Sequence, residues 1–159
     1  VHLQFPFSFI MKVTLFFAGC WALIGPQEVN GTVGGSVLVP CQYNEDYQSY
    51  RKYWCRGDNW RQCSMDIQTT GSEEEVGQKK LSITDNHTLC IFTVTMKDLQ
   101  EEDDNTYWCG IERSGYDLMI PVRVFILPGK FLVVLASVGL RSKINMQPCC
   151  HAGWGTHNV

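Results

Sequence analysis

Two cysteines far apart in the sequence, Cys41 and Cys109, constrain the fold of this chain more than any other feature. Trp54 follows the first cysteine by thirteen residues, and Tyr107 precedes the second by two. A disulfide between such distant cysteines requires the intervening chain to fold back on itself through several strands. A bulky indole against a disulfide that joins two sheets, with a tyrosine shortly before the second cysteine, is typical of a β-sandwich. The pattern predicts an all-β fold with Trp54 and Tyr107 in its core.

The cysteine content indicates an oxidising compartment. The chain has 159 residues, enough for one domain with a substantial core, and eight of them are cysteines. No Cys-x-x-Cys pair occurs in the sequence, and no set of cysteines and histidines has zinc-site spacing. The run Cys149-Cys150-His151 has no further ligands nearby, so a metal site there is the weaker interpretation. Disulfides in a secreted or extracellular chain explain the count better.

The N-terminal region has the pattern of a secretory signal peptide. Met11 and Lys12 precede an apolar run that ends at Ile24, followed by Gly25 and Pro26. A run of about 12 residues is too short to cross a bilayer, which needs about 20. We therefore expect residues 1–25 to be upstream residues plus a signal peptide that starts at Met11. The alternative is a buried hydrophobic strand.

The C-terminal region predicts no ordinary membrane span. Its apolar stretch, from Phe131 to Leu140, is short and is bounded by Lys130 and Arg141. We expect residues 129–159 to be a tail of little structure, or the product of a mis-joined exon in place of a true span. The folded domain should then cover residues 26–128.

The charge of this domain argues against nucleic-acid binding. All 16 acidic residues lie between Glu28 and Asp117, whereas nine basic residues fall between positions 27 and 127, giving a net charge of −7. An acidic domain of this kind should not bind phosphate backbones without a cation.

Period-two alternation of apolar residues predicts the strands of the domain. Turn signals such as Gly34-Gly35 and Gly71-Ser72 separate them, and no long helical pattern occurs. The predicted strands contain Val37, Val39, Cys41 and Tyr43; residues 50–55; Leu81 and Ile83; Phe92, Val94 and Met96; Tyr107 and Cys109; and Ile120, Val122, Val124 and Ile126.

Side-chain alternation also favours one disulfide pattern. Five cysteines in the domain allow fifteen arrangements with one left over. If Trp54 faces inward, its neighbour Cys55 faces outward and is excluded from the core bridge. We therefore pair Cys55 with Cys63, across a turn, and Cys41 with Cys109 through the core.

The fifth cysteine of the domain is Cys90. It shares the alternation of Phe92 and should therefore point into the core. We expect a buried free thiol at this position. The alternative is a bond to another chain.

Two aromatic side chains should lie on the outer face beside the Cys55–Cys63 bridge. Tyr53 and Trp108 alternate with inward-facing neighbours on adjacent strands. If exposed, they form a patch that marks a dimer or ligand face. The alternative is that the hairpin after Gly57 covers them.

Several motifs together resemble a known family. They are Lys52-Tyr53-Trp54-Cys55, the extra Cys63, Gly71-Ser72-Glu73, and the string from Glu102 to Ile111 that contains Tyr-Trp-Cys-Gly. They resemble the polymeric-immunoglobulin-receptor family and, more narrowly, the CMRF-type leukocyte receptors with a single V domain. The resemblance covers about residues 25–128. It implies a V-type immunoglobulin β-sandwich with a core disulfide and a second, family-type disulfide.

One motif departs from the family pattern. The usual Asp-x-Gly-x-Tyr reads Asp103-Asp104-Asn105-Thr106-Tyr107 here. Asparagine adopts left-handed backbone more readily than most residues, so we expect Asn105 to preserve the turn.

The same resemblance implies a salt bridge between Lys80 and Asp103. A partly exposed pair of this kind is worth up to about 1 kcal/mol. The alternative is that Lys80 is simply solvated.

The resemblance also implies a ligand site in two loops at one end of the domain. The loops are residues 44–49 and residues 112–117, named below the first and the second loop. The candidate ligand residues are Asp46, Tyr47, Glu112, Tyr116 and Asp117.

Some members of the family recognise lipid head groups, and the acids of these loops are compatible with a calcium ion. Glu45, Asp46, Glu112 and Asp117 would be its ligands if the loops converge. Solvated loop acids are the alternative, and we expect no other cofactor.

Two sequons, Asn30-Gly31-Thr32 and Asn86-His87-Thr88, are candidate glycosylation sites, although such short motifs also occur by chance.

The sequence predicts a binding protein rather than an enzyme. Within the domain, His87 is the single histidine and Cys90 has no obvious base beside it. We expect a cell-surface innate immune receptor that binds an extracellular protein or lipid and signals, with a membrane adaptor in a full-length form. No tyrosine follows Tyr116, so signalling is implied by the resemblance alone. The alternative is a secreted decoy, or an immunoglobulin-binding or transport receptor.

Overall fold

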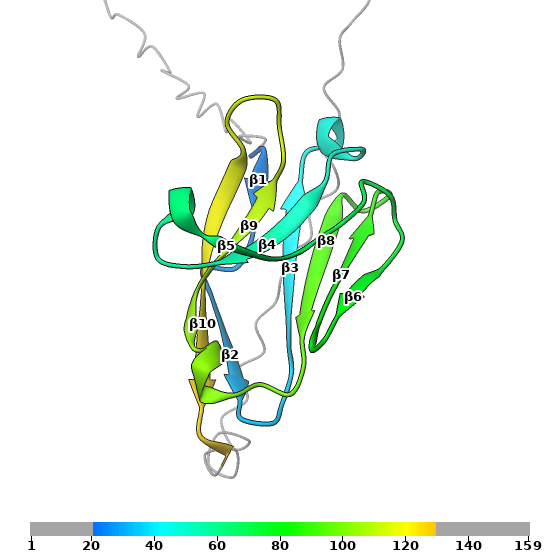
Figure 1. The fold of residues 1–159 in the computed structure, drawn as a ribbon. Coiled ribbons are helices and arrows are strands. Elements are labelled where there is room, and N and C mark those ends of the chain that lie inside the picture. Colours follow the sequence, from blue (N-terminus) through cyan, green and yellow to red (C-terminus); the bar gives the residue numbers. More distant parts are fainter. Residues whose placement is uncertain (1–20, 130–159) are drawn as a thin grey trace, which may run out of the picture.

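The computed structural model describes residues 21–129, which form two packed β-sheets (Figure 1). The expectations for residues 1–20 and 130–159, including the start at Met11 and the Cys149-Cys150-His151 run, lie outside the described residues. The elements are β1 (Leu23–Ile24), β2 (Glu28–Thr32), β3 (Val37–Tyr43), η1 (Glu45–Tyr47), β4 (Lys52–Arg56), η2 (Trp60–Gln62), β5 (Ser64–Gln68), β6 (Val76–Gln78), β7 (Leu81–Asn86), β8 (Ile91–Met96), η3 (Glu101–Asp103), β9 (Asn105–Ile111) and β10 (Leu118–Leu127).

The strand order is that of a V-type sandwich. One sheet has the order β1-β3-β8-β7-β6, and the other has the order β2-β10-β9-β4-β5. Neighbouring strands run antiparallel except β2 and β10, which pair in parallel. The predicted all-β immunoglobulin sandwich is thereby confirmed.

The core contains the side chains that the alternation predicted to face inward. Val39, Cys41, Phe92 and Val94 are fully buried on the inner face of one sheet. From the other sheet, Trp54 is equally buried and stacks on Tyr107, with ring centroids 4.9 Å apart and planes 9° apart.

Both predicted disulfides are present. Cys41 is bonded to Cys109 across the core, and Cys55 to Cys63 on the outer side of the second sheet. Cys90 is fully buried, as its alternation predicted. It is also disulfide-bonded, so the expectation of a free thiol is wrong.

The turn before Tyr107 is built differently from the sequence prediction. Among the described residues, positive φ angles outside glycine occur at Lys79, Cys90 and Asp98, and not at Asn105. The short helix η3 makes the turn instead, and Asn105 begins β9 in extended conformation. The Tyr107 hydroxyl donates to the Asp103 carbonyl at 3.1 Å, which ties the corner to the strand.

The start of the domain includes part of the segment assigned to the leader. Leu23 and Ile24 pair with β3, and Leu23 is buried in the core. The expectation that residues 1–25 include a signal peptide stays a prediction.

Candidate functional site

The two predicted ligand loops lie at the same end of the sandwich, the upper end in Figure 1. The first loop contains η1 and connects β3 to β4, and the second connects β9 to β10. The two loops are in contact, because the Arg113 guanidinium lies 5.8 Å from the centre of the Tyr47 ring. Directly after the first loop, the Arg51 carbonyl accepts a hydrogen bond from Glu112 N–H at 3.0 Å.

An open hollow of about 340 Å³ lies between the second loop and the two residues that follow the first loop; it is lined by Tyr50, Arg51, Glu112, Arg113 and Ser114. Arg51 and Glu112 face each other across it at 3.8 Å, and both side chains are about half exposed. A pair so exposed contributes little stability and leaves both charges accessible to a ligand.

The first loop is an ordered turn. Asn44 caps η1 by accepting a hydrogen bond from Asp46 N–H at 3.0 Å. Tyr47 packs edge-on against Tyr50, with ring centroids 5.5 Å apart. Asp46 is exposed, whereas Tyr47 is half-buried.

The second loop is held by its last acidic residue. Asp117 accepts hydrogen bonds from the Tyr53 hydroxyl at 2.8 Å and from Arg113 N–H at 3.0 Å. Burial, reinforced by Asp117, raises the pKa of Tyr53 above its ordinary value. Tyr116 is 85% exposed at the tip. A rigid exposed tyrosine of this kind supplies contact area at low entropic cost.

The acids of the loops do not form the calcium site that sequence analysis considered. Residues 21–129 contain no group of three or more His, Cys, Asp or Glu side chains that could hold a metal ion. Asp117 is engaged with Tyr53 and Arg113, and Glu112 faces Arg51.

A buried ion pair beneath the first loop was missed by sequence analysis. Lys52 and Asp85 are both inaccessible to solvent, and their Nζ and Oδ2 atoms are 2.7 Å apart. Burial lowers the pKa of Lys52, and the nearby Asp85 opposes that effect. The Tyr43 hydroxyl donates to Asp85 at 2.6 Å, and burial raises its pKa above the ordinary value. Lysine side chains are seldom fully buried, so the sequence predicts an exposed position for Lys52. Its place in the Lys52-Tyr53-Trp54-Cys55 motif is the one sequence feature that points to a special role for this lysine.

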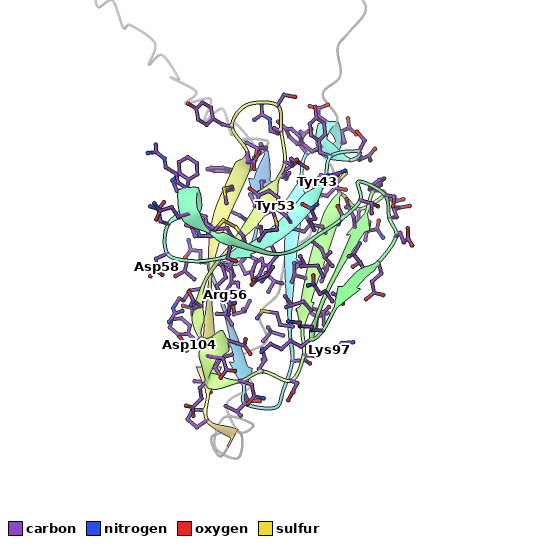
Figure 2. All side chains as sticks on the ribbon, in the orientation of Figure 1. Tyr43, Tyr53, Arg56, Asp58, Lys97 and Asp104 are labelled. Atoms are coloured by element: carbon purple, nitrogen blue, oxygen red, sulfur yellow. A yellow bond between two sulfur atoms is a disulfide. The ribbon has the colours of Figure 1, made fainter. Side chains whose placement is uncertain are left out.

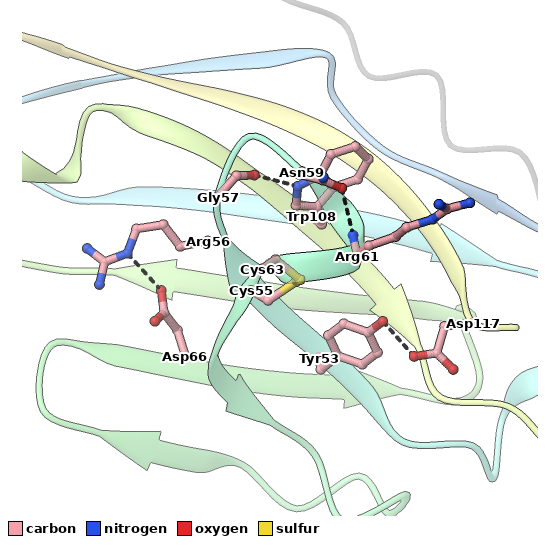
Figure 3. Close-up of a disulfide and its surroundings, with 10 residues drawn as sticks. All are labelled: Tyr53, Cys55, Arg56, Gly57, Asn59, Arg61, Cys63, Asp66, Trp108 and Asp117. Carbon is pink, nitrogen blue, oxygen red and sulfur yellow. Dashed lines mark hydrogen bonds and ion pairs between the residues drawn. A yellow bond between two sulfur atoms is a disulfide. The ribbon is translucent and has the colours of Figure 1, made fainter.

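The outer-face aromatics are covered rather than exposed. Tyr53 is 4% exposed and points towards Asp117, and the Trp108 indole N–H donates to the Gly57 carbonyl at 2.7 Å (Figure 3). The hairpin after Gly57 therefore covers Trp108, which is half-buried, whereas Tyr53 is held by Asp117 of the second loop.

A second open hollow of about 470 Å³ lies between that hairpin and the second loop. Trp60, Met65 and Tyr116 are the exposed apolar members of its lining.

Lys80 and Asp103 meet at the opposite end of the sandwich. Their Nζ and Oδ1 atoms are 2.7 Å apart, Lys80 is about one-third exposed, and Asp103 is buried. Asp103 also accepts from Gln100 N–H at 2.8 Å, so this carboxylate organises the turn that leads into β9.

The two sequon asparagines are both exposed. Asn30 lies in β2, and Asn86 ends β7 with its Oδ1 accepting from Leu89 N–H at 2.8 Å.

Comparisons with known proteins agree with this architecture. A family model of the immunoglobulin V-set domain matches residues 24–124. Human CMRF35-like molecule 1 is 48% identical over 122 residues, which cover 74% of this chain and 42% of the relative. Mouse CMRF35-like molecule 2 is 38% identical over 137 residues, which cover 82% of this chain and 70% of the relative.

Among solved structures, the polymeric Ig receptor ectodomain of a teleost fish matches with a TM-score of 0.54 and 30% identity, over 67% of this chain and 48% of that one. The chain spans about half the length of several of the curated relatives it matches. Among residues 21–129, no helix has the length and apolar character needed to cross a membrane.

The resemblance predicted from the motifs is confirmed, and the matched families are receptor families without enzymatic activity. The folded domain is of the kind found in immune-receptor ectodomains. The chain belongs to the immunoglobulin V-set family and, within it, to the CMRF35-like molecules.

Proposed function

We propose that this chain is the ligand-binding ectodomain of a cell-surface innate immune receptor. The observation that carries the proposal is the open hollow between the second loop and residues 50–51, which directly follow the first loop, with Tyr116 exposed in the second loop. The ligand is an extracellular protein or lipid, and its binding is transmitted by the full-length receptor, alone or through a membrane adaptor. The full-length form resides in the plasma membrane.

A binding screen tests this proposal. The chain, secreted from mammalian cells, is immobilised and exposed to phosphatidylcholine vesicles with and without phosphatidylserine, and to purified immunoglobulins. Each is tested with calcium and with EDTA. Saturable binding that Tyr116→Ala weakens supports the loop site, and Leu38→Ala is the matched control because Leu38 is 62% exposed on the other sheet. Binding that both variants weaken equally, or neither weakens, would contradict it.

A secreted decoy or transport receptor is the second candidate, favoured by the likeness to the polymeric Ig receptor ectodomain. The immunoglobulin arm of the screen addresses it directly. Sequencing the complete transcript separates the two candidates, because a surface receptor requires an in-frame apolar segment of about 20 residues.

We also propose that Asn30 and Asn86 carry N-linked glycans, since both asparagines are exposed. The secreted chain should lose mass on endoglycosidase digestion, in two steps that Asn30→Gln and Asn86→Gln remove one at a time. An unchanged mass would mean that neither sequon is used.

A further inference from the structure

The buried pair formed by Lys52 and Asp85 lies directly beneath the first loop. Lys52 comes from β4 in one sheet and Asp85 from β7 in the other, so the pair bridges the sandwich. Taking two charges out of water costs free energy that a hydrophobic pair would not incur. The remaining contacts of the two side chains indicate a role other than general stability.

The ammonium group of Lys52 makes one ion pair and two hydrogen bonds. The ion pair is with Asp85, and the hydrogen bonds are donated to the backbone carbonyls of Gln48 and Tyr50, each at 2.7 Å. The Tyr43 ring lies 4.3 Å from the ammonium. Both hydrogen bonds thus hold the backbone where the first loop ends and the chain enters β4.

The first loop also contacts the two turns that contain Gly71 and His87. Gln48 Nε2 donates to the His87 carbonyl at 2.8 Å, and His87 N–H donates to Glu73 at 2.7 Å. A Cβ on Gly71 would lie 2.8 Å from the Ser49 carbonyl oxygen, so the loop rests on a turn that only glycine accommodates. The loop is therefore supported from below by Lys52 and from the side by two neighbouring turns.

We propose that Lys52 and Asp85 are positioning residues for the first loop. Asp85 orients the ammonium of Lys52 from the opposite sheet, and Lys52 fixes the carbonyls of Gln48 and Tyr50, so that the loop is formed before any ligand arrives. The inference rests on the proposed function only in treating this loop as a ligand loop.

The chain offers a matched control in its other lysine–aspartate pair. Lys80 lies before the first residue of β7 and Asp85 near its end, so the two pairs sit at opposite ends of one strand. Both described hydrogen bonds of the Lys80 ammonium go to the Asp103 carboxylate. Loss of Lys80 should therefore weaken the domain without acting on the first loop.

Hydrogen exchange of the full secreted chain, followed by mass spectrometry, tests the proposal. K52M/D85N removes both charges together, so no buried charge is left unpaired, and the amide at position 85 still accepts from Tyr43. Peptides covering residues 44–50 should exchange at least about tenfold faster, because the amides of Tyr47, Gln48 and Tyr50 close the turn. Peptides from β8 and β9 should stay within about twofold of the unmodified chain. K80M should leave the exchange rate of residues 44–50 unchanged relative to that of the core.

Unchanged protection of residues 44–50 in K52M/D85N, or a uniform rise across all peptides, would overturn the proposal. If that variant is not secreted, the unmodified chain provides the test through NMR of its lysine ammonium groups. Lys52 should give an ammonium signal that persists at neutral pH because it is shielded from water, and absence of such a signal would overturn the proposal. Faster loop exchange with unchanged binding to the vesicle or immunoglobulin identified by the screen would support the positioning role and count against the loop as the ligand site.

Discussion

Four successive residues of β4 have four different partners. Lys52 and Trp54 point inward, the first to the buried pair with Asp85 and the second to the core. Tyr53 and Cys55 point outward, the first to Asp117 in the second loop and the second to its disulfide. Because side chains alternate along a strand, this one segment contacts the first loop, the second loop, the core and the outer hairpin.

Tyr116 is the residue at which we expect an effect on ligand binding without an effect on folding. It is 85% exposed, so Tyr116→Ala should change the free energy of unfolding by no more than about 0.5 kcal/mol. Loss of an aromatic contact should weaken ligand binding about tenfold, or roughly 1.4 kcal/mol. Titration of the identified ligand and urea denaturation measure the two effects. Unchanged affinity would remove Tyr116 from the site.

Gly110 is required by the ring that lies against it. A Cβ at this position would lie 2.1 Å from Cζ of Tyr53, which is far inside contact distance. Gly110→Ala should displace the Tyr53 ring, break its hydrogen bond to Asp117 and cost about 1–3 kcal/mol, the usual range for overpacking. Urea denaturation measures the loss, and Gly77→Ala is the control because a Cβ at Gly77 meets no atom within 4 Å. Equal stability of the two variants would contradict this account of the Tyr-Trp-Cys-Gly motif.

The hairpin from β4 through η2 to β5 is the element that covers the outer face. The Gly57 carbonyl of this hairpin accepts a hydrogen bond from the Trp108 indole N–H, and its Cys63 is disulfide-bonded to Cys55 (Figure 3). The register between β4 and β5 shifts between Trp54 and Cys55, so the disulfide secures the hairpin where the ladder is irregular.

Removal of this disulfide should leave the domain folded. Its loop is short, with a sequence separation of 8, and the chain-entropy model assigns the disulfide about 2.5 kcal/mol. The core disulfide has a sequence separation of 68, and the same model assigns it about 4 kcal/mol. C55A/C63A should therefore lower the free energy of unfolding by about 2.5 kcal/mol, measured by urea denaturation. Failure of this variant to fold would show that the hairpin contributes more than loop closure.

Across the whole molecule, the loop end and the opposite end are stabilised in different ways. Tyr43 and Tyr53 lie near the loops, whereas Lys97 and Asp104 lie towards the other end (Figure 2). The buried Lys52–Asp85 pair belongs to the first region, and the partly exposed Lys80–Asp103 pair to the second. Salt should therefore screen the second pair more than the first.

Stability should fall in alkaline solution because three tyrosines are buried. Burial raises the pKa of Tyr107 to about 12, and it raises the pKa of Tyr43 and Tyr53 further. Their stabilising contribution is complete below pH 10, where the unfolded chain also keeps these protons, and is lost as pH rises towards the folded values. Each tyrosine can remove up to about 1.4 kcal/mol per pH unit in that window. The lowered pKa of Lys52 has the opposite effect on stability, which rises with pH as the folded lysine loses its proton. This effect ends once the lysine of the unfolded chain also loses its proton.

Tyrosinate absorbance and near-UV circular dichroism measure this effect. The ionisation of Tyr43, Tyr53 and Tyr107 should coincide with loss of the circular dichroism signal above pH 10. Smooth titration of every tyrosine while the fold persists would contradict the assigned burial.

The sequence by itself determined the sandwich and both predicted disulfides, because these depend on local alternation and on cysteine spacing, and the resemblance of its motifs indicated the family. Trp54 has to face inward for the core to form, and that one constraint places Cys55 outside. Only the tertiary structure decided the fate of Lys52, Tyr53 and Asn105. Lys52 is buried because Asp85 arrives from the other sheet, Tyr53 is covered because the second loop folds over it, and Asn105 is extended because η3 makes the turn. Those outcomes depend on contacts between segments distant in sequence, and alternation along a single strand carries no information about them.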